Sequence, residues 1–231
     1  MALTRDNIRD GFIAKMLAEG PPGFRISTEA ELEASLTGMF AGGVPTDDTH
    51  LFGYGSLIWN PAFHFADSAV GTVHGLHRRF CLWTTLGRGT PEQPGLTLGL
   101  DRGGSCRGVV FRIPPKDALE ELRIVWRREM VSDAYIPRWV TVRTAAGSVR
   151  AITFVINRAH ERYAGRLDEP ETAKAIAIAS GRIGPCAEYL ENTVAHLQQL
   201  SITDLHLERL LRLCRQACQE KAAPTSPPTG T

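Results

Sequence analysis

The central part of the chain, from His50 to Ile156, consists of strand-like segments interrupted by a single helical segment. These segments are rich in Val, Ile, Thr and aromatic residues, which favour β-strands. The predicted strands cover residues 51–54, 69–74, 79–84, 96–100, 107–113, 139–143 and 149–156. A doubly wound α/β fold needs regular alternation of strands and helices, which this pattern lacks. The sequence therefore predicts an α+β fold with a mixed sheet or small barrel and helices on one side.

Helical patterns lie within and on both sides of this centre. Apolar residues at helical spacing predict one short helix around residues 8–17 and a second that starts at Thr28, where Glu31 completes a capping-box pattern. Further helices are expected over residues 117–130, 171–180, 185–200 and 203–220. We expect residues 1–45 to be a helical extension, residues 46–221 the main domain and residues 222–231 a flexible tail.

Composition narrows the class of protein. Hydrophobic residues make up 43% of the 231 residues, enough for a sizeable core. The formal net charge is only +1, and no basic stripe is evident, so a nucleic-acid partner is not expected. No apolar run reaches the ~18–20 residues of a membrane span. The charged N-terminus does not match a secretory signal, and five scattered cysteines fit reduced thiols, so we expect a cytoplasmic protein.

The first candidate for a binding site is the segment Gly53-Tyr54-Gly55-Ser56-Leu57, at the end of a short apolar strand. Small residues there allow backbone N–H groups to converge on an anion and allow a ligand to approach the main chain closely. The segment is not a P-loop, because no Gly-Lys-Ser/Thr follows it. An ordinary tight turn explains the same spacing.

The second candidate is Glu129, near the end of the predicted helix 117–130. Its spacing from Leu122, Val125 and Trp126 places its carboxylate on the apolar, inward face of that helix. Apolar surroundings and the C-terminal end of a helix both raise the pKa of a carboxylic acid, as a general base working near neutral pH requires. The alternative is a structural ion pair with Arg127, Arg128 or a more distant arginine.

The remaining cysteine-containing segments do not form a complete catalytic or metal-binding motif. Gly104-Ser105-Cys106-Arg107-Gly108 has the spacing of a nucleophile elbow, but a strand follows it, so a hairpin turn that enters a strand is expected. Cys214 and Cys218 stand four residues apart on a predicted helix, without a second ligand pair. We expect neither a metal site nor a cofactor.

A series of motifs occurs in the order found in the ChaC-type γ-glutamylcyclotransferases. The segment LFGYGSLIW at 51–59 resembles the glycine-rich opening strand and loop of that family. The further matching blocks are GLHRRF at 75–80, RGT at 88–90, PG at 94–95, CRGV at 106–109, RE at 128–129 with Tyr135 beyond it, and EYL at 188–190. The resemblance covers about residues 50–200.

This resemblance implies a γ-glutamylcyclotransferase-like fold, a small mixed barrel surrounded by helices. It implies cleavage of glutathione to 5-oxoproline and cysteinylglycine without a cofactor or metal. The catalytic glutamate of the family matches Glu129. The residues expected to bind substrate are Tyr54, Gly55, Ser56 and Leu57 through backbone groups, Tyr135 and Tyr189 as lining aromatics, and Arg88 for the glycine carboxylate.

Two other functions stay open at this point. The same fold could act on other γ-glutamyl amino acids or amines. Substrate preference depends on the wall of the site, and in segment 130–134 this chain lacks the glycines that some members of the family carry. A non-catalytic γ-glutamyl-binding regulatory module is the other alternative. The sequence predicts no oligomeric state.

Overall fold

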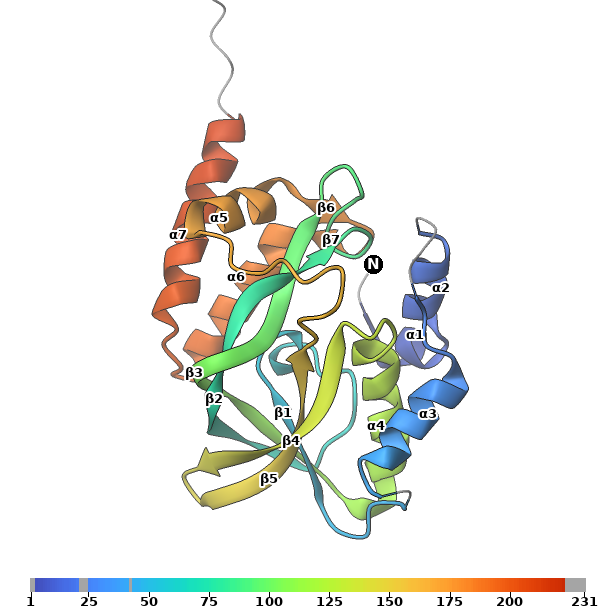
Figure 1. The fold of residues 1–231 in the computed structure, drawn as a ribbon. Helices are drawn as coiled ribbons and strands as arrows, with labels where there is room; N and C mark the ends of the chain where they lie inside the picture. Colours follow the sequence, from blue (N-terminus) through green and yellow to red (C-terminus); the bar gives the residue numbers. More distant parts are fainter. Residues whose placement is uncertain (1–2, 21–24, 42, 223–231) are drawn as a thin grey trace, which may run out of the picture.

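The strand-rich centre of the chain closes into a barrel in the order β1-β3-β2-β4-β5 (Figure 1). The computed structural model describes residues 3–20, 25–41 and 43–222. The strands are β1 (Thr49–Gly53), β2 (Asp67–Thr84), β3 (Gly95–Ile113), β4 (Tyr135–Thr144) and β5 (Gly147–Ile156). Most neighbours pair antiparallel, whereas β5 pairs parallel with both β1 and β3. The mixed barrel surrounded by helices that the resemblance implies is confirmed, whereas the expectation of helices on one side only is wrong.

The two longest strands correct the sequence prediction. The sequence predicts separate strands over 69–74 and 79–84, but both segments belong to β2, and the two segments 96–100 and 107–113 both belong to β3. Gly75, at φ +81°, lies where the ladder between β2 and β3 shifts its register, and Gly103 and Gly104 opposite also have positive φ. The glycines therefore bend the paired strands at a bulge and do not end them. The predicted turn at residues 104–108 lies inside β3.

One helix, α4 (Pro115–Glu129), connects β3 to β4. Its fully buried Leu122 and Trp126 pack against the barrel residue Phe154. On another side of the barrel lie α5 (Glu169–Ile178), α6 (Cys186–Gln199) and α7 (Leu205–Ala222), close to the positions predicted for them (Figure 1). Between α5 and α6, two short strands, β6 (Ser180–Gly181) and β7 (Gly184–Pro185), form a hairpin.

The N-terminal part forms α1 (Arg5–Arg9), α2 (Phe12–Ala18) and α3 (Glu29–Gly38), which lie beside α4 (Figure 1). The single helix predicted around residues 8–17 is wrong, because Gly11, at φ +76°, separates α1 from α2. The capping box of Thr28 and Glu31 at the start of α3 is confirmed. Residues 21–24, between the two predicted N-terminal helices, and residues 223–231 of the predicted tail lie outside the described residues. The division of the chain at residue 45 stays a prediction.

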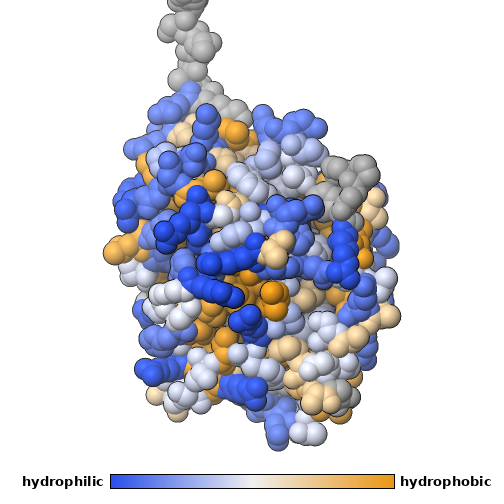
Figure 2. All heavy atoms as spheres, in the orientation of Figure 1, coloured by the Kyte–Doolittle hydropathy of each residue, from blue (hydrophilic) through white to orange (hydrophobic). Residues whose placement is uncertain are grey.

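One face of the molecule is mostly hydrophilic. Hydrophilic side chains cover most of the face seen in Figure 2, and apolar ones gather in a smaller area near its centre. Across residues 3–20, 25–41 and 43–222, no helix is both long and apolar enough to cross a membrane.

Candidate active site

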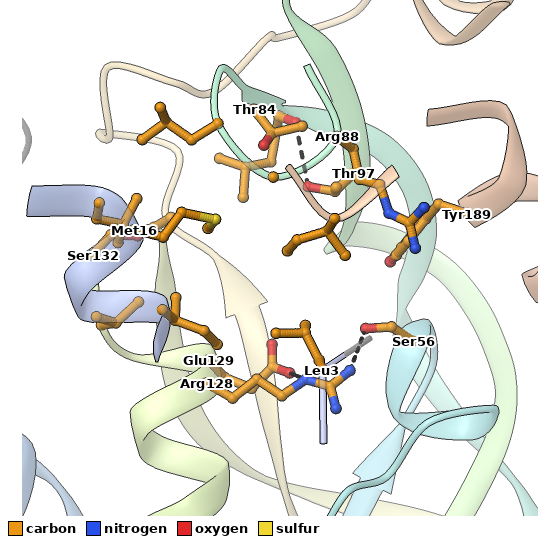
Figure 3. A pocket seen from close by; sticks show the side chains of 18 of the residues that line it. Leu3, Met16, Ser56, Thr84, Arg88, Thr97, Arg128, Glu129, Ser132 and Tyr189 are labelled. Atoms are coloured by element: carbon orange, nitrogen blue, oxygen red, sulfur yellow. Dashed lines mark hydrogen bonds and ion pairs between the residues drawn. The ribbon is translucent and has the colours of Figure 1, made fainter. Parts of the chain in front are cut away.

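Glu129 is the last residue of α4 and faces a cavity of about 560 Å³. The apolar face of α4 packs on the barrel, so the turn that ends the helix lies at the edge of the core. Only 14% of the Glu129 side chain is exposed. The inward orientation expected from the spacing along the helix is therefore what the structure shows (Figure 3).

The surroundings of Glu129 favour its protonated form. Burial raises the pKa of the Glu129 carboxyl above its ordinary value, and the charge and hydrogen bond of Arg128 oppose that shift. Nε of Arg128 lies 3.1 Å from Oε1 of Glu129. The ion pair considered from the sequence alone is thus present, but desolvation outweighs it. A carboxyl with a raised pKa can both accept and return a proton near neutral pH.

Arg128 connects this carboxylate to the glycine-rich loop. Its Nη2 donates a hydrogen bond to Oγ of Ser56 at 2.8 Å, and its Nη1 donates to the backbone carbonyl of Asn60 (Figure 3). The Arg128 side chain is itself only 5% exposed. The sequence indicated Arg128 only as one of several partners for Glu129, because nothing local shows that it reaches the loop.

The loop itself turns sharply between β1 and the short 3-10 helix η1 (Ser56–Ile58). A side chain at Gly55 would place its Cβ 3.0 Å from the hydroxyl of Tyr189, so any other residue there would push the tyrosine aside. Ser56 lines the cavity. The side chains of Tyr54 and Leu57 are buried elsewhere: the Tyr54 hydroxyl donates to the Phe154 carbonyl at 2.8 Å.

Two further tyrosines line the cavity, as expected from the resemblance. Tyr189 comes from α6 and makes edge-on contacts with Trp59 and Phe80. Burial raises the pKa of Tyr189 to about 12, and the pKa of Tyr135 lies well above its ordinary value for the same reason. Both hydroxyls therefore stay protonated at neutral pH and can donate hydrogen bonds. The Tyr135 hydroxyl donates to the Leu98 carbonyl at 2.7 Å.

Arg88 also lies in the cavity wall, but it is already engaged. Its Nη1 donates to Oε2 of Glu188 at 2.9 Å and to the Pro185 carbonyl at 3.0 Å. An anionic ligand at Arg88 would therefore share the guanidinium with Glu188. Close by, the buried hydroxyl of Thr85 has no hydrogen-bond partner among the described residues, and it lines the same cavity. No sequence pattern pointed to Thr85.

Five of the eight residues expected at the site line one cavity: Glu129, Ser56, Arg88, Tyr135 and Tyr189. Tyr54, Gly55 and Leu57 flank Ser56 in the loop but are not part of the cavity lining. Within the part of the chain that the structure describes, no group of three or more His, Cys, Asp and Glu side chains is arranged to hold a metal ion.

Known proteins are similar to this chain in sequence and in fold. The family model described as "ChaC-like protein" matches residues 49–217. The glutathione-specific gamma-glutamylcyclotransferase of Escherichia coli is 42% identical over 162 residues, which are 70% of each chain. The glutathione-specific gamma-glutamylcyclotransferase 1 of mouse is 33% identical over 168 residues, which cover 70% of this chain and 75% of the mouse protein. A crystal structure of the glutathione-specific cyclotransferase from yeast superposes with a TM-score of 0.70 at 24% identity, over 76% of this chain and 99% of the yeast chain, and so has the same fold. The resemblance expected from the ordered motifs is confirmed, and the chain belongs to the ChaC-like family.

Proposed function

We propose that this protein is a γ-glutamylcyclotransferase that cleaves glutathione to 5-oxoproline and cysteinylglycine. The observation that carries the proposal is the buried carboxyl of Glu129, joined through Arg128 to the Ser56 loop at one cavity. The names of relatives up to 42% identical support glutathione as the substrate.

The reaction closes a ring within the substrate. The α-amine of the γ-glutamyl group attacks the γ-carbonyl carbon, a new C–N bond closes the five-membered lactam, and the bond to the cysteinyl nitrogen breaks. No water is consumed. Because nucleophile and electrophile belong to one molecule, the protein mainly has to hold the chain folded, and such orientation contributes up to ~7–11 kcal/mol.

Glu129 moves the proton in this scheme. The α-amine has a reference pKa of ~8, so at neutral pH it must lose a proton before it can attack. Glu129 takes that proton and then gives it to the departing cysteinyl nitrogen. The raised pKa of the buried carboxyl suits both steps.

The surrounding groups bind the ends of the substrate. The first N–H groups of a helical turn have no partner within the turn, so the backbone at Ser56 and Leu57 can hold the α-carboxylate. The protonated hydroxyl of Tyr189 is a donor for the developing oxyanion, an interaction often worth ~3–4 kcal/mol. Arg88 and Thr85, which line the same cavity, are suited to the glycine carboxylate.

The direct test is to incubate purified protein with glutathione and to quantify 5-oxoproline and cysteinylglycine. Glu129→Gln keeps the shape of the side chain and should reduce the rate by ~10²–10⁴. Glu120→Gln, on the same helix but with 74% of its side chain exposed, is the matched control and should keep full activity. A Glu129→Gln variant as active as the wild type would end the assignment of this residue.

A panel of γ-glutamyl amino acids and amines tests the alternative substrates. Turnover of these compounds at rates above that of glutathione would change the substrate but not the reaction. Tight binding of glutathione without any product would favour a non-catalytic γ-glutamyl-binding module. The cytoplasmic location and the absence of a nucleic-acid partner stay predictions.

A further inference from the structure

The cavity has an apolar wall that the proposed reaction does not use. This wall is supplied by residues of the N-terminal part of the chain: Leu3, Ile13, Met16 and Leu17. All four lie before residue 49, where the match to the family model begins. In Figure 3, Met16 of α2 projects toward the cavity on the side opposite Tyr189, and Leu3 lies next to Arg128 and Glu129. A segment outside the family match therefore faces the reacting groups directly.

The apolar wall is fixed to the elements that carry the site. The carbonyl of Leu3 accepts a hydrogen bond from Nδ2 of Asn60 at 2.9 Å, in the loop that Arg128 also binds. Arg5 of α1 forms an ion pair with Glu121 of α4, whose side chain is only 4% exposed. The backbone N–H of Ser27 donates to the carbonyl of Val131 at 2.9 Å, two residues beyond Glu129. The wall is thus part of the folded site.

The packing behind the wall is also apolar. Ile13, Met16 and Leu17 belong to one buried cluster, which includes Ile8, Ile124 and Val131 and against which Leu86 and Ile183 pack. Met16 is 5% exposed and Leu17 is 7% exposed. A polar group placed against such a surface loses its hydration without gaining a partner, whereas a thiol or alkyl group loses little.

The rest of the cavity lining includes polar and charged groups. Ser56, Arg128 and Glu129 suit the charged γ-glutamyl end, and Arg88 adds a further charged group to the lining. A tripeptide held by both of its charged ends has one remaining group, the side chain of its second residue. The apolar wall offers a surface for that side chain.

We propose that Leu3, Ile13, Met16 and Leu17 form the subsite for the side chain of the second residue of the substrate, and that this subsite selects a thiol or alkyl side chain over a hydroxyl. The inference rests on the proposed function, since it concerns the same cavity. It assigns to the N-terminal helices a role in substrate selection.

Three tripeptides test the subsite, because they share both charged ends and differ in one group. They are glutathione, γ-glutamyl-2-aminobutyryl-glycine and γ-glutamyl-seryl-glycine, with thiol, methyl and hydroxyl groups at the same position. We expect the wild-type protein to cleave the first two with similar kcat/KM and the seryl peptide about 10-fold or more less efficiently.

Met16→Gln places an amide in the wall at nearly unchanged size. It should reduce the preference for the aminobutyryl over the seryl peptide by about 5-fold or more, mainly through a higher KM for the apolar peptide. Met16→Leu should keep the preference. Ile8→Ala is the control for lost packing, because Ile8 belongs to the same buried cluster but does not line the cavity. It should lower the Tm and leave the preference unchanged.

The outcomes separate this inference from the proposed function. Equal kcat/KM for all three peptides, or the same preference in Met16→Gln as in the wild type, would overturn the subsite and leave the cyclotransferase activity standing. Failure of the wild-type protein to cleave any of the three would overturn the proposed function, and the subsite with it.

Discussion

Nη2 of Arg128 donates a hydrogen bond to Oγ of Ser56 at 2.8 Å. The same guanidinium lies 3.1 Å from the carboxylate of Glu129 through its Nε. One side chain therefore fixes the distance between the proposed proton carrier and the loop that is proposed to bind the substrate. Because Arg128 and Glu129 are neighbours at the end of one helix, packing of α4 on the barrel positions both at once.

Removal of the Arg128 charge should change the pH dependence of the reaction. The charge and hydrogen bond of Arg128 lower the pKa of Glu129, against the larger effect of burial. In Arg128→Met the pKa of Glu129 should rise further. The acidic limb of kcat/KM, measured between about pH 4 and 9 with glutathione, should then move to higher pH, and kcat should fall.

Arg127→Met is the matched control for this experiment. Arg127 precedes Arg128 on the same helix but pairs with the exposed Glu29 on α3. A surface pair of this kind contributes little to stability. The acidic limb of kcat/KM for Arg127→Met should coincide with that of the wild type. An equal shift in Arg127→Met and Arg128→Met would show that the effect does not come from the contact with Glu129.

Glu129→Gln should stabilise the fold at neutral pH. Burial raises the folded-state pKa of Glu129 above its ordinary value of 4.5, so the folded protein favours the neutral acid. The stability from that neutral form is fully present below about pH 4.5 and is lost as the pH rises through the folded-state pKa. At about pH 7.5 the Gln variant avoids an ionised buried group, so its Tm should exceed that of the wild type, and the difference should vanish toward about pH 4.

Glu33→Gln provides a control of opposite sign. Its hydrogen bond with Arg123 lowers the pKa of Glu33, so the ionised form contributes stability above the ordinary carboxyl pKa. That variant should have a lower Tm than the wild type at about pH 7.5, with the difference closing at low pH. Equal pH profiles for Glu129→Gln and the wild type would contradict a raised pKa at Glu129.

The parts of the site that the sequence predicted are those encoded over short distances. The spacing of Leu122, Val125 and Trp126 along one helix was enough to orient Glu129 inward, because helical periodicity fixes which residues share a face. The short strand followed by Gly55 and Ser56 likewise indicated a tight loop. Helices after residue 165 followed from the same periodicity.

The parts that were missed depend on long-range packing. The bond between Arg128 and Ser56 joins residues 72 positions apart, and no local pattern contains it. The apolar periodicity around Met16 predicted a helix but not that its side chain faces the cavity of Glu129. The two strands predicted on either side of Gly75 are one strand, because a glycine at positive φ serves a bulge as well as a turn.

Gly55→Ala should disturb the contact between the loop and Tyr189. The added Cβ would lie 3.0 Å from the Tyr189 hydroxyl, which is closer than carbon and oxygen normally approach, and Tyr189 is only 7% exposed. We expect a lower Tm for Gly55→Ala, and a smaller loss when the same change is made in Tyr189→Phe, because that variant lacks the hydroxyl. Thermal unfolding of the wild type, the two single variants and the double variant gives the coupling energy between Gly55→Ala and the Tyr189 hydroxyl.

Gly38→Ala serves as the control for the glycine substitution. A Cβ at Gly38, the last residue of α3, would meet nothing within 4 Å. Replacing glycine by alanine in a helix without a clash is neutral or slightly stabilising. Equal losses for Gly55→Ala with and without the Tyr189 hydroxyl would show that the close contact is not what requires glycine in the loop.

The ion pair between Arg5 and Glu121 should account for much of the attachment of α1. Glu121 is 3% exposed, and its carboxylate accepts hydrogen bonds from Nη2 of Arg5 at 2.8 Å and from the backbone N–H of His64 at 2.8 Å. Arg5→Met leaves this carboxylate buried without its cation. Breaking a buried pair in this way costs about 3–5 kcal/mol, and we expect the lower end because 20% of the Arg5 side chain is exposed.

Urea unfolding measures this loss, and two comparisons identify its origin. The Arg9 side chain is 53% exposed and pairs with Asp6 on the same helix, so Arg9→Met should change the free energy of unfolding by less than about 0.5 kcal/mol. The double variant Arg5→Met with Glu121→Gln should recover part of the loss, because the amide needs no counter-ion. A double variant less stable than Arg5→Met alone would mean that Glu121 stabilises the fold through His64, and that α1 is held mainly by the packing of Ile8.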